Sequence, residues 1–432
     1  MALTAQVHFL DGTLSLIHIP LSLYPTLLQP ILRLLFPQSR GSPPDLNLDS
    51  LTLDSSQHGF LNISVTPLEC SIVCHSSWAK TIFEPAIKQL PRDTAKTVII
   101  SKDDYVVFSV ISVGMDAGSR VADLTSPLAL ANIPLFFITT YYSDFILVPV
   151  KDRQAVEKTL LSRGFVFSED SDDSFPFTSP YSTNHGRRAS QGSSLNELPT
   201  TARQQPPPPS AIPELQERTF DNLKKRNVVP YVEQGLLLVQ CSGRQDNNMI
   251  GGYSERPSTF HTNGHGSRNR HSAHKPCWAD TVDTKLYTGL VSALVSQPRF
   301  FSITLAQDDP PSLLLDRELV GIFGDSLVGA TTEGGVSLVP IFLDLSSLPI
   351  EATGIVSGVA GTLVKELKEQ YGAVAEEEED GGGGGRGRGS AQEEELELSF
   401  LSTVRAGAVI LGEEVSIRAM EALSRVLVRE GK

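Results

Sequence analysis

The most constraining feature of this sequence is a series of apolar patterns that occurs twice. Residues 94–168 follow the order strand, helix, strand, strand, helix, strand, and residues 335–432 repeat that order. The repeat aligns Thr140 with Thr403 and Asp144 with Gly407. Because this order places two helices on one face of an antiparallel sheet, it predicts an α+β chain of ferredoxin-like (βαββαβ) modules.

Two further stretches carry weaker versions of the same pattern. Residues 13–90 and 218–330 each offer strand-like runs separated by amphipathic segments. A chain of 432 residues is also long enough for several small modules. The sequence therefore predicts four modules in two tandem pairs, with 13–90 followed by 94–168 and 218–330 followed by 335–432.

Three polar or glycine-rich segments interrupt this pattern. Their compositions bury too little apolar surface to offset the entropy of ordering. We therefore predict a disordered linker at 169–215 and disordered insertions at 242–275 and 376–394. The linker contains RRAS at residues 187–190, a pattern typical of kinase substrates, so Ser190 is a candidate phosphorylation site.

Charge and cysteine content narrow the class of protein. A net charge of −14 argues against a nucleic-acid-binding surface, which needs clustered basic residues. The N-terminus lacks the pattern of a secretory signal, and the three prolines of the apolar stretch 14–36 favour a strand and a helix over a membrane span. Cys70, Cys74, Cys241 and Cys277 have no matched pairs at metal-binding spacing, so we expect buried free thiols in a cytoplasmic protein.

The sequence offers little support for catalysis or cofactor binding. It contains no Gly-x-Ser-x-Gly nucleophile elbow and no Walker-type lysine. Gly354, Gly358 and Gly361 are spaced for close helix packing and not for a dinucleotide-binding loop. We therefore expect a non-catalytic protein without metal or cofactor. A glycine- and serine-rich segment holds the residues that could suggest a metal site, but they are not spaced as metal ligands usually are. These residues are His261, His265, His271, His274 and Cys277.

Three stretches resemble a known family. They are residues 119–148 (SRVADLTSPLALANIPLFFITTYYSDFILV), 351–364 (EATGIVSGVAGTLV) and 60–73 (FLNISVTPLECSIV). These stretches resemble the CASTOR family of cytosolic arginine sensors, proteins with four ACT domains. The resemblance implies that an amino acid binds between the second and fourth ACT modules. It also implies that the liganded protein releases an inhibited GATOR-type complex upstream of the TOR kinase.

The resemblance and the physics of helix starts point to one ligand site. A helix N-terminus offers unpaired N–H groups to a carboxylate, and a glycine lets ligand and backbone come close. Thr353, Gly354, Ile355 and Val356 stand at such a start in the fourth module. Asp123 matches a ligand-contacting position, although a helix cap is an alternative role for it. The further positions that the resemblance implies are Leu124, Thr403, Val404 and Gly407.

The turn of the second module has an implied role in binding the partner complex. Tyr141, Tyr142 and Asp144 match the stretch that makes this contact in the CASTOR family. The alternative interpretation is a solvated turn in which Asp144 bonds to its own backbone.

The sequence departs from the family at the predicted ligand site. The family has an acidic residue where this chain has Gly407, and an aromatic residue where it has Val404. A buried guanidinium without a carboxylate partner is costly, so the ligand could be an amino acid other than arginine, or absent. Three functions stay open, an amino-acid sensor, a ligand-free scaffold and a regulatory subunit of an amino-acid biosynthetic enzyme. A homodimer stays open as well.

Overall fold

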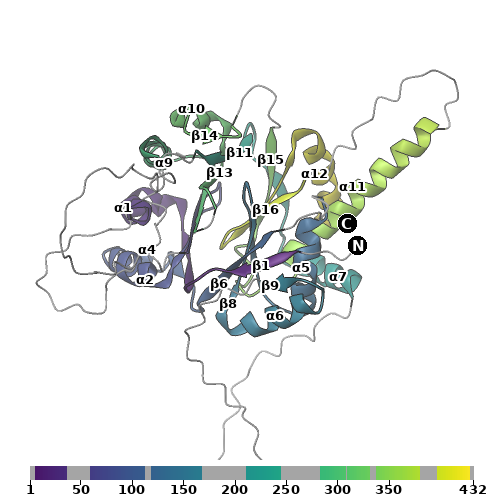
Figure 1. The fold of residues 1–432 in the computed structure, drawn as a ribbon, viewed down its shortest axis with the longest axis horizontal. Helices are drawn as coiled ribbons and strands as arrows, with labels where there is room; N and C mark the ends of the chain where they lie inside the picture. The colour runs from purple at the N-terminus through teal and green to yellow at the C-terminus, as the bar shows by residue number, and fades with distance from the viewer. Residues whose placement is uncertain are drawn as a thin grey trace, which may run out of the picture.

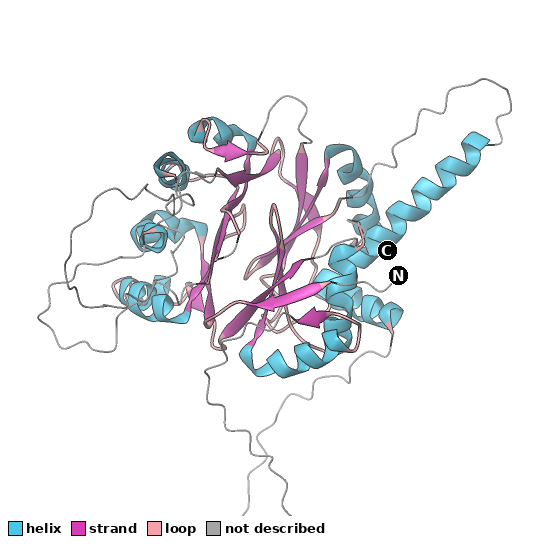
Figure 2. Ribbon diagram, in the orientation of Figure 1, coloured by secondary structure: helices cyan, strands magenta, loops and turns pink. Residues whose placement is uncertain are grey.

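Two β-sheets face each other in this computed structural model, and helices cover the outer side of each (Figures 1 and 2). The layers therefore run helices, sheet, sheet, helices. This mixed helix and strand content agrees with the predicted class. The structure describes residues 5–36, 59–111, 118–167, 211–244, 283–307, 309–330, 337–379 and 397–428.

The first sheet is antiparallel. Its strands lie in the order β5 (Ile99–Ile100), β2 (Leu14–Ile19), β4 (Cys70–His75), β3 (Phe60–Val65), β12 (Phe301–Ala306), β13 (Ser312–Asp316), β11 (Leu238–Gly243) and β14 (Leu327–Val328).

The second sheet is antiparallel except for the pairing of β9 with β1. Its strands lie in the order β9 (Val166–Phe167), β1 (Gln6–Phe9), β6 (Tyr105–Ile111), β8 (Asp144–Pro149), β7 (Phe136–Thr139), β16 (Ser399–Ser402), β17 (Ala406–Gly412), β15 (Leu338–Asp344) and β10 (Pro230–Val232).

Two short bridges join the sheets. Leu14 pairs with Tyr105 between β2 and β6, and Leu238 pairs with Leu338 between β11 and β15. The hydrogen-bonded network therefore closes as a flattened barrel.

The helices form the two outer layers of Figure 1. The layer at the left of that view contains α1 (Tyr24–Leu35), α2 (Ser76–Trp78), α3 (Glu84–Lys88), α4 (Arg92–Ala95), α9 (Thr284–Val295) and α10 (Val320–Phe323). The layer at the right contains α5 (Arg120–Leu130), α6 (Arg153–Leu161), α7 (Ile212–Lys225), α11 (Ile355–Glu379) and α12 (Glu413–Leu427). Shorter helical turns occur at Leu21–Leu23 (η1), Ala79–Phe83 (η3), Val150–Asp152 (η4) and Arg317–Leu319 (η5).

Three hydrophobic cores hold these layers together. Between the sheets, Phe60, Phe145 and Phe342 are buried in one cluster with small and branched side chains. The other two clusters lie between each sheet and its helices, where amphipathic helices turn their apolar sides to the strands. Burial of this apolar surface is the main stabilising contribution to the fold.

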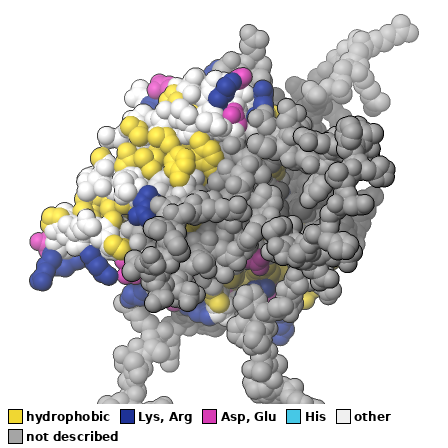
Figure 3. Space-filling model, turned by 60° about the vertical axis from the view of Figure 1, so that its left-hand side comes forward, with side chains coloured by type: hydrophobic (Ala, Val, Ile, Leu, Met, Phe, Trp, Pro, Cys, Tyr) yellow, Lys and Arg dark blue, Asp and Glu magenta, His cyan; other side chains and the backbone are white. Residues whose placement is uncertain are grey.

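The helix layer that contains α1 and α9 also exposes apolar side chains. Phe36, Val295 and Ile322 are exposed there, and Figure 3 shows apolar side chains gathered on this side of the molecule. Contiguous apolar surface of this kind marks interaction sites in many proteins. The predicted homodimer stays a prediction.

The same strand order recurs around the sheets. In the first sheet, β5-β2-β4-β3 and β14-β11-β13-β12 each place the strands of one βαββαβ unit in the ferredoxin-like order fourth, first, third, second. In the second sheet, β6-β8-β7 and β15-β17-β16 keep the order first, third, second. The strands next to β6 and β15 are β1 and β10, each of which comes from an earlier part of the chain. Sequence order alone does not reveal this exchange.

The two halves of the chain meet through reciprocal contacts at the seam between β7 and β16. The N–H of Phe137 donates to Ser402 Oγ at 3.0 Å, and the N–H of Phe400 donates to Thr139 Oγ1 at 3.0 Å. Each bond becomes the other when the halves are exchanged, because Phe137 aligns with Phe400 and Thr139 with Ser402. The seam therefore has approximate two-fold symmetry.

Three predicted low-complexity boundaries are wrong by a few residues. The predicted linker 169–215 overlaps α7, because its end begins an amphipathic helix with Pro213 in the first turn. The predicted insertion 376–394 overlaps α11, which continues through glutamates with good helix propensity to Glu379. The insertion predicted at 242–275 starts inside β11, which ends at Gly243. The remaining residues of these segments, including Ser190, lie outside the described ranges.

Two further expectations are borne out among the described residues, the buried free thiols and the strand and helix of the apolar stretch 14–36. Cys70, Cys74 and Cys241 are free and buried, and burial raises the pKa of Cys74 and of Cys241 to about 12. Cys277 lies outside the described residues. The apolar stretch 14–36 forms β2, η1 and α1. Among the helices in the described ranges, none combines the length and apolarity needed to cross a bilayer.

Candidate functional site

A threonine organises the hairpin turn between β7 and β8. Thr140 Oγ1 donates to the carbonyl of Ser143 at 2.7 Å and accepts from the N–H of Ser143 at 3.1 Å. Thr403 makes the same pair of contacts with Ala406, at 3.1 and 3.0 Å. The predicted alignment of Thr140 with Thr403 therefore corresponds to an equivalent local structure.

A third turn has this geometry, and the sequence reasoning missed it. Thr66 Oγ1 donates to the carbonyl of Glu69 and accepts from the N–H of Glu69, both at 3.2 Å. The signal was present in the sequence, because Thr66 follows an apolar strand as Thr140 and Thr403 do.

Asp144 is a buried residue and not part of a solvated turn. Its side chain is 3% exposed, and its Oδ2 lies 2.6 Å from Nε of Arg120 at the start of α5. It therefore cannot present its carboxylate on the surface as the predicted partner contact requires, nor does it bond to its own backbone. The Asp144 carboxylate pairs instead with Arg120 of the neighbouring helix α5. The sequence pattern did not indicate this pair.

The environment of Asp144 shifts its titration. Burial raises the pKa of this carboxyl from 3.8 to about 6, while the charge of Arg120 and the hydroxyl of Thr139 act in the opposite direction. Asp144 Oδ1 is buried without a hydrogen-bond partner among the described residues, and the contact of Arg120 Nε with Asp144 Oδ2 is a close ion pair that lacks hydrogen-bond geometry. The pair is therefore incompletely satisfied, which is unusual for buried charges.

The equivalent position in the second hairpin is Gly407, which is packed and uncharged. A Cβ atom there would lie 3.4 Å from Cζ of Phe400 and 3.6 Å from Cδ1 of Leu345. These apolar side chains occupy the space into which an aspartate would point. Gly407 does not line either of the cavities described below.

The two tyrosines of the first turn lie on the surface. Tyr141 is 38% exposed and Tyr142 is 54% exposed. Tyr141 is held by a hydrogen bond from its N–H to Ser312 Oγ at 2.8 Å, and its ring lies against Gly329, where a Cβ atom would come within 2.6 Å of the tyrosine oxygen. Gly329 has a φ of +83°, so both its conformation and this close approach favour glycine.

A small cavity lies between α5 and the N-terminus of α11, at the place predicted for the ligand. Its volume is about 50 Å³. Of the predicted ligand-binding residues, Gly354, Ile355, Val356, Thr403 and Val404 line it. The remaining lining residues are Thr125, Ala129, Leu135, Phe136, Leu345, Leu348, Pro349, Ile350, Ala352, Ser357, Phe400, Ser402 and Ala406. None of these side chains is charged.

The other predicted ligand residues lie outside this small cavity. Asp123 is exposed and accepts a hydrogen bond from Ser119 Oγ at 2.7 Å, while Leu124 is buried in the core beneath α5. The helix places the two on different faces, and Thr125 and Ala129 line the cavity in their place. Thr353 Oγ1 donates to Asn132 Oδ1 at 3.2 Å.

The start of α11 is fixed by close packing as well as by its backbone. Gly354 has a φ of +81°, and a Cβ atom there would lie 2.7 Å from Thr219 Oγ1 and 2.8 Å from Leu215 Cδ1, both on α7. Gly358 and Gly361 also face α7. The three glycines therefore allow α11 to pack closely against α7, which is the helix-packing role predicted for them. Ser357 Oγ in the first turn is buried without a hydrogen-bond partner among the described residues, and the residue lines the small cavity.

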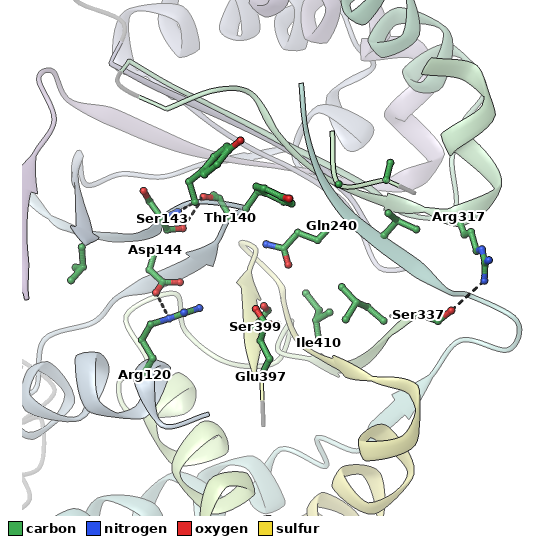
Figure 4. A pocket seen from close by; sticks show the side chains of 17 residues that line it. Arg120, Thr140, Ser143, Asp144, Gln240, Arg317, Ser337, Glu397, Ser399 and Ile410 are labelled. Atoms are coloured by element: carbon green, nitrogen blue, oxygen red, sulfur yellow. Dashed lines mark hydrogen bonds and ion pairs between the residues drawn. The ribbon is translucent and has the colours of Figure 1, made fainter. Parts of the chain in front are cut away.

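A larger, polar cavity of about 520 Å³ lies beside the first hairpin turn, between β8, β11 and β16 (Figure 4). Figure 4 shows the Arg120–Asp144 pair on one side, the Arg317–Ser337 hydrogen bond on the other, and Gln240, Glu397 and Ser399 between them. The full lining comprises Val110, Arg120, Thr140, Tyr141, Tyr142, Ser143, Asp144, Val239, Gln240, Arg317, Gly329, Ala330, Ser337, Leu338, Glu397, Ser399 and Ile410. Within the described ranges no cluster of histidine, cysteine or acidic side chains is arranged to hold a metal ion, and the histidines proposed from the sequence lie outside those ranges.

Comparison with known proteins identifies one part of the chain. The family model of the ACT domain matches residues 100–162, which span β6 to α6. The chain contains an ACT domain. This ACT domain holds Arg120, Asp144 and both exposed tyrosines. No curated protein matches the sequence.

Several solved structures are similar to this chain. One is Atu0741 from Agrobacterium tumefaciens, at 19% identity over 38% of this chain and 92% of that chain, with a TM-score of 0.24. Another is the aspartate kinase from Synechocystis, at 9% identity over 100% of this chain and 57% of that chain, with a TM-score of 0.29. A third is the regulatory subunit of aspartate kinase from Thermus thermophilus, at 11% identity over 38% of this chain and 99% of that chain, with a TM-score of 0.26.

Proposed function

We propose that this protein is a non-catalytic regulatory protein that binds a free amino acid in the small cavity between α5 and α11. ACT domains bind small amino-acid ligands, and the matched domain supplies the α5 side of this cavity. The observation that carries the proposal is the first turn of α11, where Ser357 Oγ is buried at the cavity and has no hydrogen-bond partner in the described part of the chain. Free N–H groups and the positive end of the helix dipole favour a carboxylate at such a position.

The lining of the small cavity favours a small, uncharged amino acid over arginine. A guanidinium would meet no carboxylate there, because Gly407 stands where the CASTOR family has an acid and no charged side chain lines the cavity. A volume of about 50 Å³ holds roughly three to five water molecules, which is the size range of glycine, alanine and serine.

We extend the proposal to the arrangement of the modules and to the partner complex. The recurrent strand orders and the reciprocal seam support four ACT modules in two tandem pairs. The resemblance to CASTOR proteins supports a GATOR-like partner complex upstream of TOR kinase. For that partner we propose the exposed rings of Tyr141 and Tyr142 as contacts, since aromatic side chains are enriched at interfaces, and we leave out the buried Asp144.

A thermal-shift screen of the twenty amino acids tests ligand binding. We expect glycine, alanine or serine to raise the midpoint, because a ligand at 100 times its dissociation constant stabilises the folded state by about 2.7 kcal/mol. Replacing Ser357 with Ala should weaken that shift. The matched control is Ser292→Ala, a serine on the exposed side of α9. If no amino acid moves the midpoint, the ligand-free scaffold becomes the better description.

Affinity purification with and without amino-acid starvation tests the partner. We expect a complex that is retained by the wild type and lost by Tyr142→Ala, but retained by Ile417→Ala, which removes an exposed apolar side chain on α12. Recovery of a biosynthetic enzyme in place of a signalling complex would redirect the proposal to a regulatory subunit.

A further inference from the structure

The approximate two-fold symmetry creates two equivalent crevices, one beside each threonine turn of the second sheet. In one, the N–H of Val404 donates to Ser71 Oγ at 3.3 Å. In the other, the N–H of Tyr141 donates to Ser312 Oγ at 2.8 Å. Val404 aligns with Tyr141, and Ser71 and Ser312 both lie at the start of the hairpin strand that faces the turn. These bonds define which residues correspond in the two crevices.

A carboxylate of the protein itself fills the first crevice. Glu69 is fully buried, and its Oε1 accepts from Thr403 Oγ1 at 2.6 Å and from the N–H of Arg405 at 2.5 Å. Its Oε2 lies 2.5 Å from Nδ1 of His18. The turn thus binds a carboxylate with one hydroxyl and one backbone N–H.

The second crevice has the same two donors, but among the described residues no acidic side chain stands at the position that corresponds to Glu69. The residue two positions before Ser71 is Glu69, whereas the residue two positions before Ser312 is Pro310. The donors that correspond to Thr403 and Arg405 are Thr140 and Tyr142. Both line the polar cavity of about 520 Å³.

The hydrogen bonds of these donors differ as the missing carboxylate predicts. Thr403 Oγ1 is 2.6 Å from the glutamate and 3.1 Å from the carbonyl of its turn. Thr140 Oγ1 lies 2.7 Å from the equivalent carbonyl, so its proton goes there instead. Within the described part of the chain, the N–H of Tyr142 donates to no protein acceptor. The Tyr142 N–H is therefore the donor without an acceptor among the described residues, and the Thr140 hydroxyl would have to turn from the Ser143 carbonyl to donate to a ligand.

Charged groups on the same cavity supply a second recognition element. Asp144 Oδ1 is buried without a hydrogen-bond partner among the described residues, on a side chain that is 3% exposed and lines the cavity. An ammonium group is the donor that best satisfies such an oxygen. Arg120 and Arg317 also line the cavity. Their positive charges offset the repulsion that acidic lining residues would exert on a ligand carboxylate.

We propose that the polar cavity is a second ligand site, for a small molecule with both a carboxylate and an amine. The ligand carboxylate takes the position that Glu69 has in the first crevice, bound by the Thr140 hydroxyl and the Tyr142 N–H. The ligand amine binds Asp144 Oδ1. This site is separate from the small cavity at α11 and has room for a larger ligand, since pockets of several hundred Å³ hold drug-sized molecules.

Equilibrium dialysis of the full chain against each of the twenty amino acids tests the proposal. For every amino acid that binds, the decarboxylated amine and the des-amino acid are measured beside it. We expect both analogues to bind at least ten-fold more weakly than the parent. We also expect Asp144→Asn and Thr140→Val each to weaken binding at least ten-fold, with the amine-bearing analogue more sensitive to Asp144→Asn.

Thr66→Val is the matched control, because it removes the same turn hydroxyl outside both cavities. It should leave the dissociation constant unchanged, which separates loss of a ligand contact from loss of turn stability. Two results overturn the proposal, an absence of binding by all twenty amino acids, and binding that is lost in Ser357→Ala but unaffected by Asp144→Asn and Thr140→Val. The latter result places the ligand in the small cavity and leaves the proposed function standing.

Discussion

The turns at 140–144 and 403–407 have the same main-chain bonds and opposite side-chain chemistry. Each is closed by a threonine hydroxyl, and each donates an N–H to a serine of the other sheet. The first leads into an aspartate paired with an arginine beside an open cavity, whereas the second leads into a glycine packed under Phe400. This fold therefore fixes the backbone of a turn while leaving its side-chain chemistry free to change.

The largest expected effect on stability comes from removing the Glu69 carboxylate, which fills the crevice beside the second turn. Glu69→Ala would leave His18, Thr403 and Arg405 without their shared acceptor in a buried position. We expect a loss of about 3–5 kcal/mol in the free energy of unfolding, measured by denaturant titration. The surface variant Glu84→Ala should change it by less than about 0.5 kcal/mol. A loss of similar size in both variants would mean that Glu69 does not hold the turn in place.

The next test exchanges the chemistry of the two turns. Gly407→Asp would bury a carboxylate against Phe400 and Leu345, and we expect it to destabilise the protein by about 2–4 kcal/mol. Gly407→Ala adds only a Cβ atom at 3.4 Å from the Phe400 ring and should stay within about 1 kcal/mol. Thermal or chemical unfolding measures both. Equal effects would show that the second turn tolerates charge as the first does.

The third test uses the pKa of Asp144. This carboxyl has a pKa of about 6 in the folded protein, above its ordinary value of 3.8, so the folded state binds the proton more tightly than the unfolded state. Its contribution to stability is therefore fully present below pH 3.8 and is lost as the pH rises through about 6. Relative to Asp144→Asn, the wild type should lose on the order of 2 kcal/mol between pH 3.5 and pH 7.

That pH dependence is measured as unfolding free energy of both proteins across the range, so that other titrating groups cancel. A stability difference that is flat with pH would show that Arg120 fully compensates the buried charge.

The smallest effects should come from the threonines that close the turns. Thr66→Val, Thr140→Val and Thr403→Val each remove one hydroxyl with two turn contacts, and each should cost about 1 kcal/mol. Thr403→Val also removes a bond to Glu69 and should be the most destabilising of the three. An equal loss for all three by denaturant titration would indicate that the Glu69 contact adds nothing.

Local pattern was enough to predict the kinds of elements and the alignment of the two turns. Hydrophobic period distinguishes a strand from a helix, and the recurrence of Thr140 and Thr403 depends on the turn itself. The pattern did not reveal that β1 and β10 enter sheets of later parts of the chain, because strand pairing is a non-local choice.

The predicted residues that line the small cavity come from two local features, the start of α11 and the turn between β16 and β17, which supplies Thr403 and Val404. Gly354 to Val356 line the small cavity because they begin α11. Asp123 failed to reach it because the rotation of α5 turns Thr125 and Ala129 inward. The burial of Asp144 and of Glu69 could not be predicted, since each depends on a partner from a distant segment, Arg120 for one and Thr403 for the other.

The reciprocal bonds of the β7–β16 seam have a consequence for how this molecule could change. Such a contact, in which each half gives what it receives, is the kind that two identical subunits make about a two-fold axis. Identical subunits must repeat every substitution at both ends of their assembly. Because both halves of this protein belong to one polypeptide, the two ends can change independently. One end can therefore be filled by a side chain while the other stays open in the same molecule.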